Sequence, residues 1–252
     1  MQSGDVILVD FTATERITNQ IVETTIEQDA KKANAFNPKA MYKPVPLVVG
    51  KKELFEKVDK AFEIMQVGDE KKIELEASEA FGERKAELIA IIPLQQFKKQ
   101  KMNPMPGLII EADGKQGKVQ SVSGGRVRVD FNHPLAGKKI EYKVVVRKKI
   151  EDKQEQVEAI FEKYFPHVKP DEKQIKVEGE TVKIVLPERL KEQKETTVFK
   201  QVFAKILPDQ LGGIKEVQFV ESFETQKKDS KKTESKTQEK PAKKEGLRGK
   251  GF

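Results

Sequence analysis

The stretch that decides the fold runs from Phe131 to Val146 and reads FNHPLAGKKIEYKVVV. From Ile140 onward apolar residues alternate with charged ones, which predicts a half-buried strand. A strand with the same alternation is predicted from Ile73 to Ala77, far earlier in the chain. The segment between them has prolines in its first half and a hairpin pattern turning at Gly124-Gly125 in its second. The sequence therefore predicts a small domain inserted between these two strands.

The chain before this segment alternates between strand and helix patterns. Apolar residues are dense from Asp5 to Phe11, which predicts a largely buried strand. After Gly50, apolar residues recur at spacings of three and four up to Met65, which predicts an amphipathic helix. Residues 26–44 show no periodicity and contain Asn, Pro and Lys, so we expect a long loop there.

The pattern changes again after Ile150. A helical stripe is predicted over residues 157–164, two short strands flank a turn at residues 178–180, a second helix covers residues 198–206, and a last strand begins at Val217. This order, αββαβ, is typical of a small two-layer domain. From Thr225 onward almost no apolar residues remain, and such a composition predicts disorder.

The composition excludes several classes of chemistry. The 252 residues include no cysteine, which excludes disulfides, thiolate metal sites and cysteine nucleophiles. His133 and His167, the two histidines, fit no metal-ligand or catalytic-triad spacing. No apolar run approaches the roughly 18 residues that a membrane-spanning helix needs. We therefore expect a cytoplasmic protein with no membrane contact, no metal and no organic cofactor.

The positive charge of the chain is concentrated at one end. The formal net charge is +7, from 48 basic and 41 acidic residues. Residues 225–252 carry nine lysines and one arginine against four acidic residues, a net charge of +6, and residues 1–224 carry the remaining +1. Contact with nucleic acid, if it occurs, is therefore expected from the tail.

Several short motifs occur in a defined order over residues 1–150. They are the strand ending at Phe11, Val22-Glu23-Thr24-Thr25, the helix from Gly50 to Met65, Val67-Gly68-Asp69, Ala80-Phe81-Gly82-Glu83 and, most specifically, NHPLAGK at residues 132–138. With these motifs the chain resembles FKBP-type peptidyl-prolyl cis-trans isomerases of the SlyD-like group. Its extra C-terminal module and basic tail resemble the long archaeal-type members.

The resemblance implies an α+β fold in which an antiparallel FKBP sheet wraps one helix. It also implies a small β-rich inserted domain and a separate C-terminal αββαβ domain. We expect the isomerase domain at residues 1–85 and 137–150, an insert-in-flap chaperone domain at 86–136, a C-terminal α+β domain at 151–224 and a disordered basic tail at 225–252.

The resemblance also implies an enzyme that assists folding by rotating Xaa-Pro amides in an apolar pocket, with no acid or base. Carried over position by position, the pocket consists of Phe11, Val22, Glu23, Val45, Leu54, Phe55, Val58, Phe81, Leu135 and Tyr142. Four of these residues depart from the family pattern. Phe11 and Phe81 replace tyrosines, Glu23 replaces an aspartate, and Val58 replaces a larger side chain.

By the same resemblance, unfolded or proline-containing polypeptides bind to the inserted domain. Its apolar residues exceed what a small core needs, and Met suits adaptable binding. The expected client-binding residues are Ile89, Ile91, Ile92, Leu94, Phe97, Met102, Met105 and Leu108. The alternative is that most of them form the core of the inserted domain.

Two further functions remain open at this stage. The pocket substitutions favour, as the alternative to an enzyme, a catalytically weak FKBP-like holdase or binding scaffold. Weak contact of the tail with nucleic acid or the ribosome is a third hypothesis, and binding would then fall steeply with salt. The role of residues 151–224 is also open, and a dimer through this domain is one hypothesis.

Overall fold

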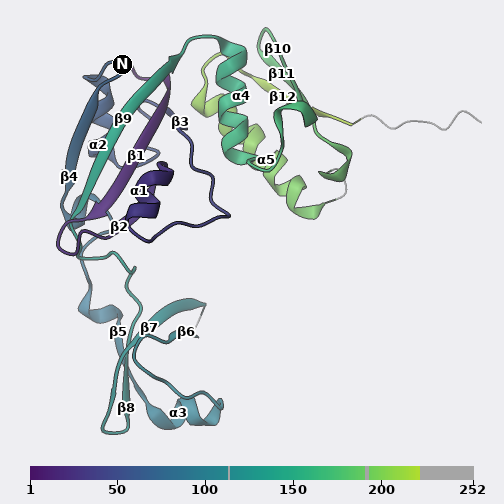
Figure 1. Ribbon diagram of the computed structural model, residues 1–252. Helices are drawn as coiled ribbons and strands as arrows, with labels where there is room; N and C mark the ends of the chain where they lie inside the picture. Colours follow the sequence, from purple (N-terminus) through teal and green to yellow (C-terminus); the bar gives the residue numbers. More distant parts are fainter. Residues whose placement is uncertain (113, 191–192, 222–252) are drawn as a thin grey trace, which may run out of the picture. The chain divides into compact units, whose positions relative to one another are not determined.

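The computed structural model describes residues 1–112, 114–190 and 193–221 (Figure 1). The predicted disordered tail at residues 225–252 lies outside this range. No helix in the described ranges is both long and apolar enough to cross a membrane.

The first sheet contains five antiparallel strands in the order β2-β1-β9-β4, with β3 paired to β1. Figure 1 shows β1, β9 and β4 side by side. Apolar side chains of the sheet and of α2 form one buried core. The elements are β1 (Val6–Glu15), β2 (Ile21–Thr24), α1 (Glu27–Lys32), β3 (Val45–Val48), α2 (Glu56–Glu63), β4 (Glu70–Leu75), the 3-10 turn η1 (Ala77–Glu79) and β9 (Ile140–Ile150).

The inserted domain has a four-stranded antiparallel sheet of its own, in the order β5-β8-β7-β6. Its small core contains Phe97, Ile110 and three valines of β7 and β8. The predicted turn at Gly124-Gly125 is confirmed, with φ of 55° and 73°. The elements are η2 (Ala86–Leu88), β5 (Ile89–Pro93), α3 (Leu94–Lys99), β6 (Ile109–Ala112), β7 (Lys115–Ser123) and β8 (Arg126–Asp130).

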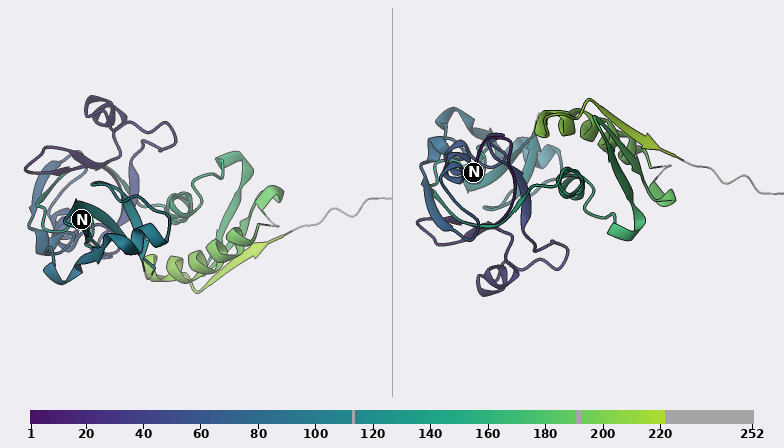
Figure 2. Two further views of the ribbon diagram at one scale, coloured as in Figure 1. Left: turned by 90° about the horizontal axis from the view of Figure 1, so that it is seen from below. Right: turned by 90° about the horizontal axis from the view of Figure 1, so that it is seen from above.

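The C-terminal domain has the predicted order αββαβ. Its two long helices pack against one face of a three-stranded sheet, as Figure 2 shows. The apolar cluster of this domain also includes Val6, Val48 and Ile150 of the first sheet. The elements are α4 (Lys153–Tyr164), η3 (Pro170–Glu172), β10 (Gln174–Glu178), β11 (Thr181–Val185), η4 (Glu188–Leu190), α5 (Lys194–Gln210) and β12 (Glu216–Val220).

Two local predictions were wrong. The expected loop at residues 26–44 contains the short helix α1. Helix α2 begins at Glu56 rather than directly after Gly50, because Gly50 and Lys52 have positive φ of 89° and 52°, which no right-handed helix allows. The N–H of Gly50 donates instead to both carboxylate oxygens of Asp59, at 3.1 and 3.0 Å. Leu54 and Phe55 therefore precede the helix instead of forming its first turn.

Candidate functional site

Four aromatic rings from distant parts of the chain form one cluster beside the core of the first sheet. The ring centroids of Phe11 and Tyr142 lie 5.7 Å apart. Phe55 lies 5.8 Å from Tyr142 and 5.3 Å from Phe81, in both cases edge to face. Edge-to-face pairs at this spacing are favourable beyond the area that they bury. The cluster thus holds the rings of β1, β9, the chain before α2 and the turn after η1 in fixed relative positions.

The strand register explains how two of these rings meet. Strand β9 pairs with β1 so that Tyr142 lies opposite Ala13, two residues from Phe11. Side chains two residues apart in a strand point to the same face. Phe11 and Tyr142 therefore both face the core side, where each is 3% exposed.

Most of the other predicted pocket residues surround this cluster. Val58 of α2 is fully buried beneath it. Val22, Val45 and Leu54 are partly buried and pack against the same core, as Phe55 and Phe81 do. Leu135 is half-buried but does not belong to this core cluster. The structure therefore brings together the apolar pocket residues predicted from the sequence, with Leu135 outside the cluster.

Glu23 and Tyr142 bring the polar groups to this apolar site. Glu23 lies on β2, and the residue as a whole is exposed to solvent. Its carboxylate is nevertheless partly desolvated, and this raises the pKa of Glu23. Burial, and then the negative charge of Glu23, raise the pKa of the Tyr142 hydroxyl to about 12. The Tyr142 hydroxyl therefore stays protonated at neutral pH and keeps a proton to donate.

His133 is a residue of the site that the sequence reasoning missed. Its ring stacks face to face on Phe81, with centroids 4.7 Å apart and ring planes 4° from parallel. The N–H of Leu135 donates to Nδ1 of His133 at 3.2 Å, which leaves Nε2 as the protonated nitrogen. The only available signal was its position in the NHPLAGK motif, two residues before the expected pocket residue Leu135.

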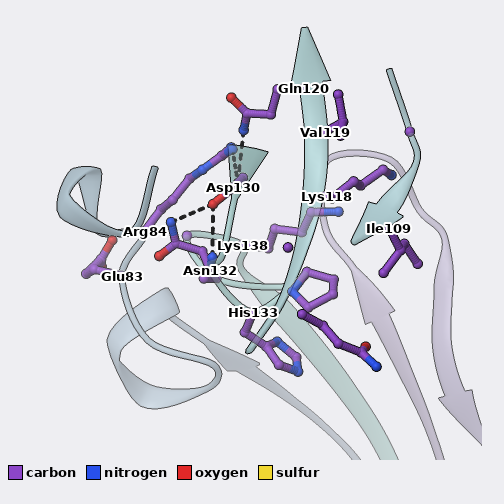
Figure 3. Close-up of a pocket in the computed structure, with 16 residues that line it drawn as sticks. Glu83, Arg84, Ile109, Lys118, Val119, Gln120, Asp130, Asn132, His133 and Lys138 are labelled. Carbon is purple, nitrogen blue, oxygen red and sulfur yellow. Dashed lines mark hydrogen bonds and ion pairs between the residues drawn. The ribbon is translucent and has the colours of Figure 1, made fainter. Parts of the chain in front are cut away.

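A cavity of about 1190 Å³ lies next to this histidine (Figure 3). It is lined by the two segments that connect the inserted domain, around Glu83 and around residues 130–138, and by β6 and β7. It does not include the four aromatic rings themselves. His133 thus borders the cavity and also contacts the aromatic cluster.

Asp130 ties the two connecting segments together at this cavity, as the dashed lines in Figure 3 show. Its carboxylate accepts from Asn132 and Gln120 and forms an ion pair with Arg84. Burial opposes ionisation of Asp130, but the hydrogen bonds from Asn132 and the charge of Arg84 outweigh it and hold its pKa below the ordinary value. The network gives the junction a defined geometry.

The expected client-binding residues fall into three groups, which are exposed, partly buried or part of the core. Ile91 and Met105 are 66% and 57% exposed, and Ile109, which the prediction omitted, is 65% exposed. Ile89 is half-buried. Phe97, at 3% exposure, is a core residue and is not accessible in this conformation. The remaining four are partly buried against the same core: Ile92, Leu94, Met102 and Leu108.

The fold and the site together define the class of protein. An antiparallel sheet wraps a short helix and presents an apolar, aromatic-walled site, with a second domain inserted beside it. Apolar and aromatic walls of this kind are suited to an apolar ligand.

Comparison with known proteins agrees with this class. Residues 1–96 match the family described as FKBP-type peptidyl-prolyl cis-trans isomerase, residues 90–135 match FKBP26, IF domain, and residues 153–224 match FKBP26 C-terminal. A short-type peptidyl-prolyl cis-trans isomerase of Methanocaldococcus jannaschii is 33% identical over 147 residues, which cover 58% of this chain and 92% of that protein.

Two bacterial proteins are similar over shorter or more divergent stretches. An FKBP-type 16 kDa peptidyl-prolyl cis-trans isomerase of Escherichia coli is 30% identical over 109 residues, 41% of this chain and 72% of that protein. The FKBP-type isomerase SlyD of Helicobacter pylori is 21% identical over 142 residues, 55% of this chain and 69% of that protein. This chain belongs to the FKBP-type peptidyl-prolyl cis-trans isomerases, which confirms the predicted family, fold class and enzyme class.

Proposed function

We propose that the site walled by Phe11, Phe55, Phe81 and Tyr142 receives the prolyl ring of a polypeptide, while the inserted domain holds the rest of an unfolded client. The observation that carries this proposal is the aromatic cluster itself. Its rings come from separate segments; Phe55 packs edge to face on Phe81 and Tyr142, and Phe11 lies tilted against Tyr142. Phe55 and Phe81 remain only partly buried, so the cluster keeps an accessible side.

The chemistry requires a desolvated site rather than an acid or a base. Rotation about the Xaa-Pro bond is slow because the planar amide is stabilised by resonance, with a barrier of about 18–20 kcal/mol. The twisted amide has less charge separation than the planar one, so apolar walls favour it relative to the ground state. Each reduction of about 1.36 kcal/mol in the barrier accelerates rotation tenfold.

Tyr142 is the hydroxyl donor that remains in the aromatic cluster. Phe11 and Phe81 lack the hydroxyls that the family usually has at these positions, so hydrogen bonding to the substrate carbonyl is reduced. The raised pKa of Tyr142 keeps its proton in place through the physiological range. Catalysis by this chain therefore depends mainly on apolar contact.

The exposed apolar side chains of the inserted domain support client binding. Ile91, Met105 and Ile109 are more than half exposed, although the domain has a core of its own. Exposed apolar groups of this kind attract the apolar residues of unfolded chains. A client held there raises the local concentration of prolyl residues at the site in the same chain.

The proposal is tested by two assays on two kinds of variant. In the full chain, Ile91, Met105 and Ile109 are replaced together by Ser, and as a control the exposed Ile17 and Ile64 are replaced by Ser. The first variant is expected to lose most of its acceleration of a proline-limited refolding reaction but to keep its turnover of a short Xaa-Pro peptide. Deletion of residues 86–136 is expected to give the same result.

Phe81→Asp tests the pocket itself. A charge in the apolar wall is expected to reduce peptide turnover by roughly 100-fold, which is about 2.7 kcal/mol in the barrier. Unchanged turnover in a folded Phe81→Asp chain would place catalysis elsewhere.

Refolding that is equally fast without the inserted domain would remove the client role of that domain. Peptide turnover no faster than buffer in the unmodified chain, with aggregation of a client still suppressed, would favour the holdase.

A further inference from the structure

Glu53 lies in the loop between β3 and α2, directly before two pocket residues. The loop is held to its own domain by two hydrogen-bond anchors. The N–H of Gly50 donates to the carboxylate of Asp59 in α2, and the N–H of Val48 donates to Oε1 of Glu53 at 3.4 Å. Leu54 and Phe55 follow at once, so the position of Glu53 governs where these two side chains enter the pocket.

Two helices of the C-terminal domain converge on the same carboxylate. Lys163 of α4 forms an ion pair with Oε2, and Nε2 of Gln210 in α5 donates to Oε1 at 3.1 Å. The same Gln210 nitrogen lies 3.4 Å from the hydroxyl of Tyr164. The Glu53 side chain is only 12% exposed. Screening by water is therefore weak here, and loss of one partner leaves a poorly solvated charge.

The groups around the Glu53 carboxylate show that its environment is poorly solvated. Burial, and then the charge of Glu53, raise the pKa of Tyr164. Oε1 of Gln210 is buried and has no hydrogen-bond partner among the described residues. An unpaired buried acceptor lowers the stability of the fold. What Gln210 contributes at this position is therefore the hydrogen bonds that its Nε2 donates to Glu53 and Tyr164.

We propose that Glu53 is a positioning residue of the isomerase pocket, through which the C-terminal domain holds Leu54 and Phe55 in place. The proposal rests on the pocket role of Phe55 proposed above, where its ring packs against Phe81 and Tyr142. Catalytic geometry is sensitive to displacements of about 1 Å, even when they originate away from the reacting atoms. The C-terminal domain thereby tunes the rate of isomerisation without touching the substrate.

A second contact between the same loop and α5 serves as a control. Lys51 pairs with Asp209 at 3.1 Å, but the Asp209 side chain is 74% exposed. Exposed pairs contribute little. The apolar cluster shared by Val6, Val48 and Ile150 with the C-terminal domain does not involve Glu53. Removing a partner of Glu53 is therefore expected to release the loop without separating the domains.

The test uses Lys163→Met and Gln210→Met in the full chain, with Lys51→Met as the matched control. The first two are expected to lower kcat/KM for a four-residue Xaa-Pro peptide by about fivefold per folded molecule, and the control to leave it unchanged. The methyl resonances of Leu54 are expected to shift in the first two only. Adding Glu53→Gln to Lys163→Met removes the unpaired charge and is expected to restore kcat/KM to within about twofold.

A purely structural role would lower the melting temperature but leave kcat/KM per folded molecule and the Leu54 resonances unchanged. Either that result, or an equal loss in Lys51→Met, would overturn the proposal. If one of the two variants fails to fold by circular dichroism, the other carries the test, and failure of both makes the contact structural and also overturns it. The pocket assignment is checked separately by Phe81→Asp, so the two failures are distinguishable.

Discussion

At the scale of single residues, the site combines apolar walls with two polar groups, the Tyr142 hydroxyl and the Glu23 carboxylate, and the pKa of each is raised. Tyr142 keeps its proton because burial and the charge of Glu23 oppose ionisation. Glu23 is itself desolvated and therefore prefers its neutral form more than an ordinary glutamate does. His133 supports the wall from outside by stacking on Phe81. Each of these effects depends on which side chains surround the residue.

The raised pKa of Glu23 predicts a pH-dependent gain from Glu23→Gln. The folded-state pKa lies above the ordinary value of 4.5, so the folded state binds the proton more tightly than the unfolded state does. Charged Glu23 therefore costs stability above the folded pKa, and the cost disappears below the unfolded one. Urea denaturation is expected to show a more stable Glu23→Gln variant at pH 7 and no difference from the unmodified chain below about pH 4. A gain of equal size at both pH values would contradict this account.

At the scale of elements, the hairpin of β7 and β8 shows how closely the inserted domain is packed. A Cβ atom at Gly117 would lie 2.7 Å from ring carbons of Phe131 and from a methyl group of Val129. Both neighbours belong to or pack against the small core of the domain. Gly117 is therefore needed for close approach between strand and ring, not for turn formation.

Gly117→Ala is expected to destabilise the inserted domain by about 1–3 kcal/mol, because the added methyl group overpacks a rigid core. Hydrogen exchange of the β7 and β8 amides measures this loss locally. Ser121→Ala, at an exposed position of the same strand, is expected to change stability by no more than about 0.5 kcal/mol. Equal exchange rates in the two variants would mean that Phe131 moves aside at no cost.

At the scale of the whole molecule, charge is distributed unevenly along the chain. Residues 225–252 hold nine lysines and one arginine against four acidic residues, and the 224 residues before them carry a net charge of only +1. In the described ranges, basic and acidic side chains form many ion pairs with each other, which is typical of a surface on which the two signs of charge are mixed.

Dimerisation through the C-terminal domain stays a prediction.

Truncation after Glu224 is expected to abolish any binding to nucleic acid. For the full chain, affinity for a short duplex is expected to fall with salt, with a logarithmic slope of about −0.9 per phosphate neutralised. The truncated chain is expected to show no measurable binding at the same low salt concentration in a fluorescence titration. Equal binding by both chains would move the contact to the folded domains.

The order of the elements could be predicted from the sequence, and the residues predicted for the pocket lie, apart from Glu23 and Leu135, in or against one core cluster. Alternation in β4 and β9, the helical spacing in α4 and α5, and the glycine turn at Gly124-Gly125 are local patterns, because side-chain periodicity follows directly from backbone geometry. The late start of α2 escaped prediction, because the apolar spacing already includes Leu54 and Phe55, whereas the backbone of Phe55 is extended, with φ of −122° and ψ of 150°.

The sequence by itself determined the element order, the family motifs and the basic tail, because each is written in neighbouring residues. Only the tertiary structure decided that Phe97 is buried while Ile91 and Ile109 are exposed, that His133 stacks on Phe81, and that Glu53 meets Lys163 and Gln210. Glu53 lies 110 and 157 positions from its two partners. Contacts over such separations depend on how whole elements pack, and no local pattern records that.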